Sequence, residues 1–383
     1  MATIIRYVNR SVVHTSGDGT TDGTGNAGTN SYYTLNDAEV ALRQTLTGVT
    51  CDVTDEQGNS TIALDILCTG GSADTTIVAF ANASWVTDAT HRIRVRLNGT
   101  GAGAKWDTSK YYLSADPAYD VGVLSIGKVL DLTLQDLQIE ATGGDMSSGN
   151  QAVHTGNFAS RLHLVRGFYR TTNTTGGAWD ETSVIVTRST GAFELWMQNV
   201  TVVVGSGTAL QIGGYSATVA AANIYNCTFI NRGSNFLVFD TANCDIGTTA
   251  RYRNLLIQGA TGANLNYESS VPGPTTSTIL TQDASSPTVG LRSLTPTFVD
   301  ATNYDYHLTS TDTGAIDDGT NLSGDATYPF STDGDTNTRS GTWDVGADEY
   351  AAGGPSAGTD TATAGLTESL NTVSVTLSIQ ESG

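Results

Sequence analysis

Apolar and polar residues alternate in five short segments in the middle of the chain, and all five carry one pattern. Each segment reads apolar, polar, apolar, polar, then a pivot position, then apolar, polar, apolar. The segments are Leu132–Ile139, Leu162–Tyr169, Leu195–Val202, Ala222–Phe229 and Ala250–Ile257. Because consecutive pivots are 30, 33, 27 and 28 residues apart, the sequence predicts a structural repeat of about 28 residues.

The pivot positions predict a sharp corner in every repeat. They are occupied by Asp136, Arg166, Asn199, Asn226 and Asn254. Asn and Asp tolerate the left-handed backbone region and hydrogen-bond their own main chain, so they favour such a corner, whereas Arg166 departs from the pattern. Alternation with a period of two before and after the pivot predicts one strand on each side of it.

A third strand is predicted in each repeat. These strands lie at Ala152–Thr155, Val184–Thr187, Leu210–Gly213 and Leu237–Asp240. Three short strands per repeat, stacked about 4.8 Å apart, indicate an all-β parallel β-helix. Tetratricopeptide and ankyrin repeats have similar periods but require helical apolar spacing, which is absent here. The residues expected to form stacked interior rows are Leu134, Leu137, Ile139, Val200, Val202, Ile224, Cys227, Phe229, Leu255 and Ile257.

The two ends of the chain differ from the repeats. Residues 1–50 are predicted to be an N-terminal segment with an amphipathic helix at Thr34–Leu46, in which Thr34 is the N-cap and Asp37 takes the capping-box position. We expect this helix to cover the open end of a solenoid at residues 51–350. The apolar face of the helix is Leu35, Ala38, Ala41, Leu42 and Leu46, and the first strands of the solenoid are expected at Ile62–Leu67, Thr76–Phe80 and Ile93–Leu97.

Composition and charge narrow the function classes. The 383 residues include 43 Gly, 7 Pro and 15% charged residues, which favours strands and tight turns. No run of about 18 apolar residues is present, so no membrane span is predicted. The net charge of −20, with only 18 Lys and Arg, argues against a nucleic-acid partner. Residues 1–13 lack a basic segment followed by an apolar one, so no secretory leader is expected.

Motifs near the end of the solenoid resemble a known family. They are PTFVDATNYDYHL at Pro296–Leu308, GAIDDGT at Gly314–Thr320, Asp333–Gly334, and DVGADEY at Asp344–Tyr350. Their order and spacing are similar to the terminal coils of pectate-lyase-like (pectin lyase-like) β-helix proteins, and GDGTT followed by TLNDAEVAL is similar to the cap of the same proteins. The resemblance implies a single-stranded right-handed parallel β-helix with an N-terminal capping helix, and it leaves the activity open.

Residues 351–383 are a linker followed by a low-complexity tail. A GGPS linker precedes one alternating segment, Val373–Ile379, which cannot form a stable strand alone. The tail resembles the Thr- and Ala-rich repeats of bacteriophage structural proteins. Together with the acidity and the missing leader, it predicts a virion structural protein: a fibre, spike or capsid decoration, made in the host cytoplasm and carried on the extracellular particle. Expected partners are other virion proteins through the tail, a second copy of the chain, and a cell-surface glycan.

The alternative functions are a polysaccharide lyase or glycoside hydrolase, as in a depolymerase spike, and a bacterial surface adhesin. A glycosidase requires two carboxyl groups about 5–9 Å apart. The acidic residues expected on neighbouring coils are Glu140, Asp145, Asp180, Glu181 and Glu194. Of these, Glu140, Glu181 and Glu194 are the candidate catalytic residues, although the sequence favours a protein without catalysis.

No cofactor is expected except calcium at one loop. Asp333, Asp335 and Asn337 have the D-x-D-x-N spacing of a calcium loop, but Asp344 stands at the twelfth position, where Glu is usual. The cysteines Cys51, Cys68, Cys227 and Cys244 lack the spacing of a metal site, and Cys227 is interpreted as a small core residue.

Aromatic residues recur in successive repeats and are candidate glycan-binding residues. They are Trp179, Trp196, Tyr215 and Tyr225. Trp196 and Tyr225 alternate with inward residues and should therefore point outward. They either form a platform for sugar rings or are covered by loops that pack on the outer face of the solenoid.

Overall fold

The structure is a computed structural model that describes residues 2–11, 19–20, 31–55, 58–81, 84–101, 103–117, 121–127, 131–143, 151–155, 160–172, 183–187, 193–205, 207–212, 217–233, 239–240, 244–246, 251–259, 265–266, 278–326 and 328–350. Residues 1–350 form one compact unit. The tail lies outside the described residues.

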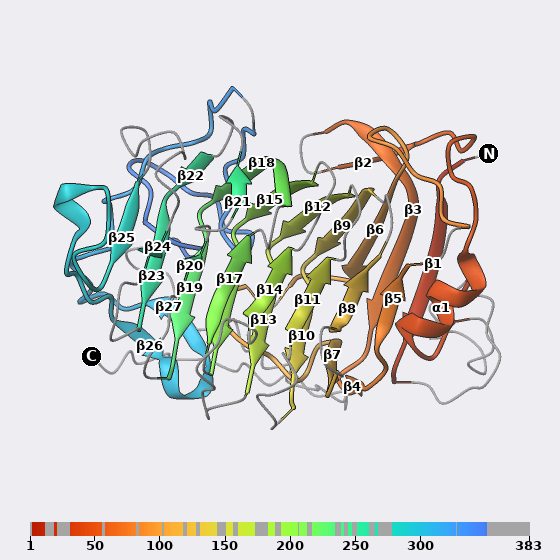
Figure 1. Ribbon diagram of the computed structural model, residues 1–383, viewed down its shortest axis with the longest axis horizontal. Helices are drawn as coiled ribbons and strands as arrows, with labels where there is room; N and C mark the ends of the chain where they lie inside the picture. Colours follow the sequence, from red (N-terminus) through yellow and green to blue (C-terminus); the bar gives the residue numbers. More distant parts are fainter. Residues whose placement is uncertain are drawn as a thin grey trace, which may run out of the picture. The chain divides into compact units, whose positions relative to one another are not determined.

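Three parallel sheets make up this unit (Figure 1). The first contains β1 (Ile4–Asn9), β3 (Ser60–Thr69), β6 (Arg92–Leu97), β9 (Asp131–Gln135), β12 (Ser160–Val165), β15 (Phe193–Gln198), β18 (Ala217–Tyr225) and β21 (Cys244–Ile246), with β2 (Val53–Thr54) antiparallel to β3 and β22 (Arg251–Arg253) beside β18. The second contains β4 (Ala73–Asp74), β7 (Tyr112–Ala115), β10 (Gln138–Ala141), β13 (Phe168–Thr171), β16 (Thr201–Val204), β19 (Thr228–Asn231), β23 (Leu255–Gln258) and β25 (Ile279–Thr281). The third contains β5 (Val78–Phe80), β8 (Gly122–Ile126), β11 (Gln151–Thr155), β14 (Ser183–Thr187), β17 (Thr208–Ile212), β20 (Phe239–Asp240) and β24 (Leu265–Asn266).

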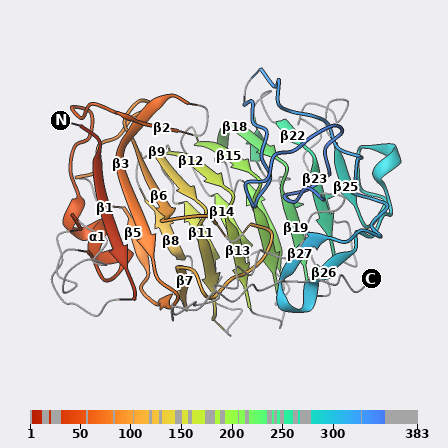
Figure 2. The ribbon, with the colours of Figure 1, turned by 180° about the vertical axis from the view of Figure 1, so that it is seen from behind.

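The order of the strands confirms the predicted fold. Consecutive strands such as β9, β10 and β11 belong to the first, second and third sheets in turn, and each strand pairs in parallel with its counterparts in the preceding and following repeats. The chain is therefore an all-β, right-handed parallel β-helix. Figure 2 shows the same sheets from behind. Among the described residues, no helix has the length and apolar character needed to cross a membrane.

Every predicted pivot forms a left-handed corner between the first and second sheets. The φ angles are 58° at Asp136, 49° at Arg166, 53° at Asn199, 50° at Asn226 and 52° at Asn254. Arg166 therefore makes the same turn as the Asn residues. Its guanidinium donates to both carboxylate oxygens of Asp136, at 2.8 and 2.9 Å, so an ion pair links two stacked corners.

The corner bends the chain from the first sheet into the second, so that the inward side chains of both strands face one interior. All ten residues predicted for the interior rows have no exposed surface. Phe229 illustrates the stacking, because it lies in register between Val202 of β16 and Ile257 of β23. The core is continuous from one repeat to the next, as a solenoid requires.

The N-terminal helix is shorter than predicted. Helix α1 spans Leu35–Leu42, with the predicted capping box between Thr34 and Asp37. Ala41, expected on the apolar face, is exposed, whereas Glu39 is buried and accepts hydrogen bonds from Arg43 and the indole of Trp85. A paired buried carboxylate is invisible to a hydrophobic pattern, which explains the error.

The N-terminal segment also contributes to the solenoid itself. Strand β1 pairs in parallel with β3 from Ile4 to Asn9, so the first sheet begins before the helix. Asp74 of the first coil ties the helix to the solenoid, because its carboxylate accepts from the main-chain NH of Leu35 and from the hydroxyl of Tyr111.

Residues 305–350, here named the closing segment, pack against the corners between the first and second sheets of the β-helix. This segment begins with β27 (Asp305–Leu308), which pairs antiparallel with β26 (Phe298–Asp300); the 3₁₀ helix η4 (Ala301–Asn303) joins them, and η3 (Val289–Leu291) precedes them. Gly346 donates its NH to the carbonyl of Asn254, and Ala347 donates to the hydroxyl of Thr228. Hydrogen bonds donated by main-chain NH groups therefore attach the closing segment to two repeats.

Arg339 is the central side chain of the closing segment. Its side chain has no exposed surface and forms an ion pair with Glu349 at 2.8 Å. It also donates to the carbonyl of Gly346 at 2.9 Å and to the side-chain oxygen of Asn199 at 3.5 Å. With the amide of Asn226 oriented to satisfy its hydrogen bonds, the oxygen of that amide accepts from Nε of Arg339 at 3.1 Å. A buried cation thus connects the closing segment to two stacked corners.

Candidate functional site

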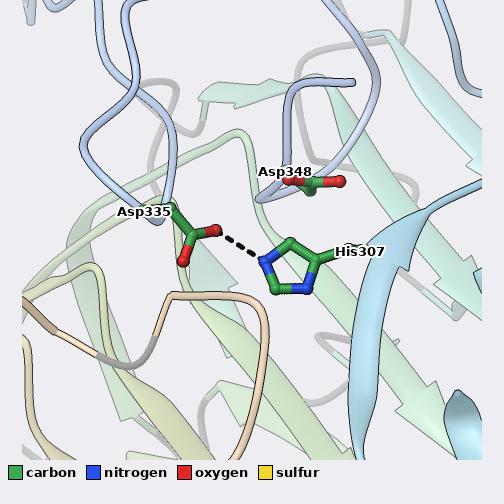
Figure 3. Close-up of side chains that lie close together, drawn as sticks. All are labelled: His307, Asp335 and Asp348. Atoms are coloured by element: carbon green, nitrogen blue, oxygen red, sulfur yellow. Dashed lines mark hydrogen bonds and ion pairs between the residues drawn. The ribbon is translucent and has the colours of Figure 1, made fainter. Parts of the chain in front are cut away.

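The closing segment gathers a histidine and several carboxylates at one place (Figure 3). His307 of β27 donates from Nε2 to Asp335 at 2.9 Å, and its Nδ1 is hydrogen-bonded to Asp305. Asp348 completes the group: single ligand atoms of His307, Asp335 and Asp348 all lie within 4.8 Å of one another. Asp348 also accepts from the main-chain NH of Leu308 at 2.7 Å. Three separate stretches of the closing segment therefore converge on His307.

The electrostatics of this cluster favour a charged imidazole. Burial alone would lower the pKa of His307, but the hydrogen bonds to Asp305 and Asp335 outweigh burial and raise it to about 11. Burial raises the pKa of Asp348 to about 7, and burial together with the neighbouring Asp335 raises the pKa of Asp333 to about 6. The imidazolium therefore compensates carboxylates that have little access to water.

The geometry fits an ion-paired clamp better than a metal centre. Both ring nitrogens of His307 are engaged by carboxylates, and an imidazolium has no free lone pair to offer a cation. Gly103 shows how closely the parts approach, because a Cβ atom there would lie 1.8 Å from a carboxylate oxygen of Asp335. The cluster joins the closing segment to itself and to the loop before β7.

The predicted calcium loop is part of the same region. The carboxylate of Asp333 accepts from the main-chain NH groups of Asp335 and Asn337, and from the side-chain amide of Asn337. Asp335 turns to His307 instead. The three predicted ligands therefore do not gather their oxygens around one point, and calcium binding by this loop stays a prediction.

Two of the predicted catalytic carboxylates are held by arginines. Glu140 is buried and pairs with Arg170, while it also accepts from the hydroxyl of Ser114 at 2.7 Å. Glu194 lies on the first sheet, where it pairs with Arg161 at 3.0 Å. Glu140 belongs to the second sheet, so the structure does not bring these two carboxylates together. Glu181, Asp145 and Asp180 lie outside the described residues.

The predicted aromatic platform is covered. Trp196 and Tyr225 do point outward from the first sheet, as expected, but the closing segment packs on them. The ring of Tyr328 lies 4.9 Å from that of Trp196 and 6.1 Å from that of Tyr225, which is 1% exposed. Tyr225 is therefore covered by the closing segment, and Trp196 is half-buried against it. Trp179 and Tyr215 lie outside the described residues.

The described cysteines form no bridge. Cys51, Cys68 and Cys227 are free, and Cys227 occupies the predicted interior position with no exposed surface. The side chain of Cys244 lies outside the described part of the chain.

Sequence reasoning missed the residues that hold the closing segment in place. His307 and Asp348 lie within the motifs DYHL and DVGADEY, which were used only to predict the fold. Arg339 lies in no motif, and it reaches Asn199 across 140 sequence positions. For His307 and Asp348, the sequence does offer one signal: ionisable residues stand beside apolar ones in the terminal motifs, which indicates charged groups held within the fold.

The clamp predicts a pH-dependent stability. The folded pKa of His307, about 11, lies above its unfolded value of about 6.5, so the stabilisation is complete below about pH 6.5 and is lost as the pH rises towards 11. We expect the free energy of unfolding to fall by on the order of 2–3 kcal/mol between pH 6 and pH 9, and His307→Gln to remove most of this fall. Urea unfolding at both pH values measures it.

The variant comparison separates the cluster of His307 and its neighbouring carboxylates from titrating groups elsewhere in the fold. Burial also raises the pKa of the thiols of Cys68 and Cys227, which lowers stability at alkaline pH in both proteins equally. An identical pH dependence in the original protein and in His307→Gln would show that the clamp carries no charge-dependent stabilisation.

Comparison with known proteins adds no relative. No protein-family model matches the sequence, and a search of curated proteins gives no significant match. The fold class rests on the strand pairing described above, and the resemblance of the terminal motifs to pectate-lyase-like proteins stays a prediction.

Proposed function

We propose that the chain is a structural protein of a bacteriophage virion, a fibre, spike or capsid decoration, whose β-helix forms a rigid shaft that also adheres to the host surface. The observation that carries this proposal is the way in which the closing segment packs on the β-helix. The segment lies over the outward aromatic residues and inserts the buried Arg339 between two corners. This arrangement favours mechanical and chemical resistance, which a particle outside the cell requires.

The distribution of charge supports the same proposal. Several buried carboxylates among the described residues form ion pairs within the fold, as with Asp65, which pairs with both Arg94 and Arg96. The alternative of a lyase or hydrolase needs a pair of carboxylates free to act on a sugar, and Glu140 and Glu194 are each engaged by an arginine on different sheets. The resemblance of the tail to phage structural repeats supplies the link to a virion.

The proposal is tested by asking whether the chain attaches to phage particles through its tail. Particles assembled in cells that express the full chain should carry it after gradient purification, as detected by immunogold labelling, whereas a chain that lacks residues 353–383 should stay in the soluble fraction. The truncated chain serves as its own folding control, because its urea midpoint should match that of the full chain. Label on the cell envelope but never on particles would favour a bacterial adhesin over a virion protein.

A further inference from the structure

A pocket of about 250 Å³ is lined by residues of β19, β23, β26, β27 and η4 and of the chain that follows β19 and β23. Pockets for drug-sized ligands measure about 300–1,000 Å³. This pocket is therefore of a size to enclose one sugar-sized ring and not a longer oligomer. None of the residues that the sequence predicted for function lines it.

One wall of the pocket carries the cation of Arg232, which no carboxylate of the described residues pairs with. Arg232 belongs to a row of stacked cations and rings. The guanidinium of Arg170 lies 3.9 Å from the ring of Trp106 and 4.2 Å from that of Tyr304, and the guanidinium of Arg232 also lies 4.2 Å from the ring of Tyr304. Arg170 is neutralised by Glu140, but among the described residues no carboxylate forms an ion pair with Arg232. Its Nη2 donates to the carbonyl of Thr302 at 3.2 Å. Stacking therefore fixes a positive charge at the pocket of a strongly acidic protein.

The other walls combine apolar rings with unpartnered polar atoms. The rings of Phe298 and Tyr306 meet edge to face at 5.2 Å, beside Ile230. Among the described residues, the side-chain oxygen of Gln258 and the hydroxyl of Tyr306 have no hydrogen-bond partner. The side chain of Gln258 is half-buried and lines the pocket. The amide group of Gln258 can therefore accept a hydrogen bond from a hydroxyl group of a ligand in the pocket.

These walls specify the chemistry of an occupant. Arg232 selects a carboxylate or sulfate group, Gln258 selects a hydroxyl donor, and the aromatic wall selects a flat apolar surface. A pyranose ring that bears one anionic substituent has all three features. We infer that this pocket binds a single anionic sugar residue of a glycan. The inference rests on the proposed adhesive function for its biological role, and it names the ligand class of that adhesion.

Calorimetry with the full chain at low salt tests the inference. The probes are methyl β-glucuronide, N-acetylglucosamine 6-sulfate and, as the neutral control, methyl β-glucoside. We expect saturable binding of at least one anionic sugar, with affinity at least tenfold weaker in Arg232→Gln. Arg253→Gln, a change on β22 of the first sheet, should leave the affinity unchanged. Phe298→Leu removes the aromatic wall and should also weaken binding, which keeps the test valid if Arg232→Gln fails to fold.

Three results would overturn the inference. They are equal binding of the neutral glycoside, equal binding of free acetate or sulfate, and no saturable binding of either anionic sugar. A protein that labels phage particles but binds no sugar would contradict the pocket and keep the virion assignment. Sugar binding by a protein that never enters particles would support the pocket and contradict the virion assignment.

Discussion

Arg339→Leu should lower the free energy of unfolding by about 3–5 kcal/mol. The guanidinium has no exposed surface and satisfies Glu349, the carbonyl of Gly346 and two corner side chains at once. Replacement by an apolar side chain removes the only cation that pairs with Glu349 among the described residues, which leaves this largely buried carboxylate with main-chain NH donors alone, and it removes the side-chain donor to the carbonyl of Gly346. Equilibrium unfolding in urea, followed by tryptophan fluorescence, measures the loss, and Trp343 reports locally because its ring lies 5.6 Å from the guanidinium.

Lys105→Leu is the matched control for a lost cation. Lys105 pairs with Asp305 at 3.3 Å, but its side chain is 50% exposed and Asp305 retains its bond to His307. We expect a change of about 1 kcal/mol or less. If both variants lost the same amount of stability, Arg339 would be an ordinary surface charge and the closing segment would not depend on it.

Phe229→Ala should cost about 3–5 kcal/mol, because it opens a cavity in the middle of the stacked core. Phe229 has no exposed surface and lies between Val202 and Ile257 in adjacent turns, so neighbouring backbone cannot collapse into the space without breaking strand register. The shift of the urea midpoint, with the slope of the transition unchanged, gives the value.

A surface residue controls for loss of apolar volume alone. Val299 is 43% exposed, so Val299→Ala should change stability by about 0.5 kcal/mol or less. A loss in Phe229→Ala no larger than in Val299→Ala would place Phe229 outside the core and contradict the strand register.

The sequence predicted those parts of the fold that repeat. A corner needs a left-handed residue and alternating strands on both sides, and these requirements recur at Asp136, Asn199, Asn226 and Asn254 in a form that one sequence reveals. Arg166 adopts the same backbone angle without the usual residue type, because its ion pair with Asp136 anchors it. Periodicity therefore located this corner even where residue preference did not.

The candidate site was less predictable, because its contacts are long-range and occur once. Nothing local to Trp196 or Tyr225 shows that Tyr328, more than 100 positions later in the chain, will cover them. The pairing of Arg339 with Asn199 likewise has no periodic signal. Hydrophobic alternation gives the direction in which a side chain points, whereas the exposure of that side chain depends on what the rest of the chain places over it.

A combined assay of binding and cleavage tests most directly whether this protein acts as a scaffold and adhesin and not as an enzyme. Purified protein is incubated with acidic and neutral polysaccharides, with and without calcium, while retained polysaccharide, reducing ends and unsaturated uronates are measured in the same samples. We expect retention of acidic polysaccharide with no product above the protein-free control. Release of reducing ends or unsaturated uronates, abolished by Glu140→Gln, Glu181→Gln or Glu194→Gln, would contradict this expectation and make the protein an enzyme.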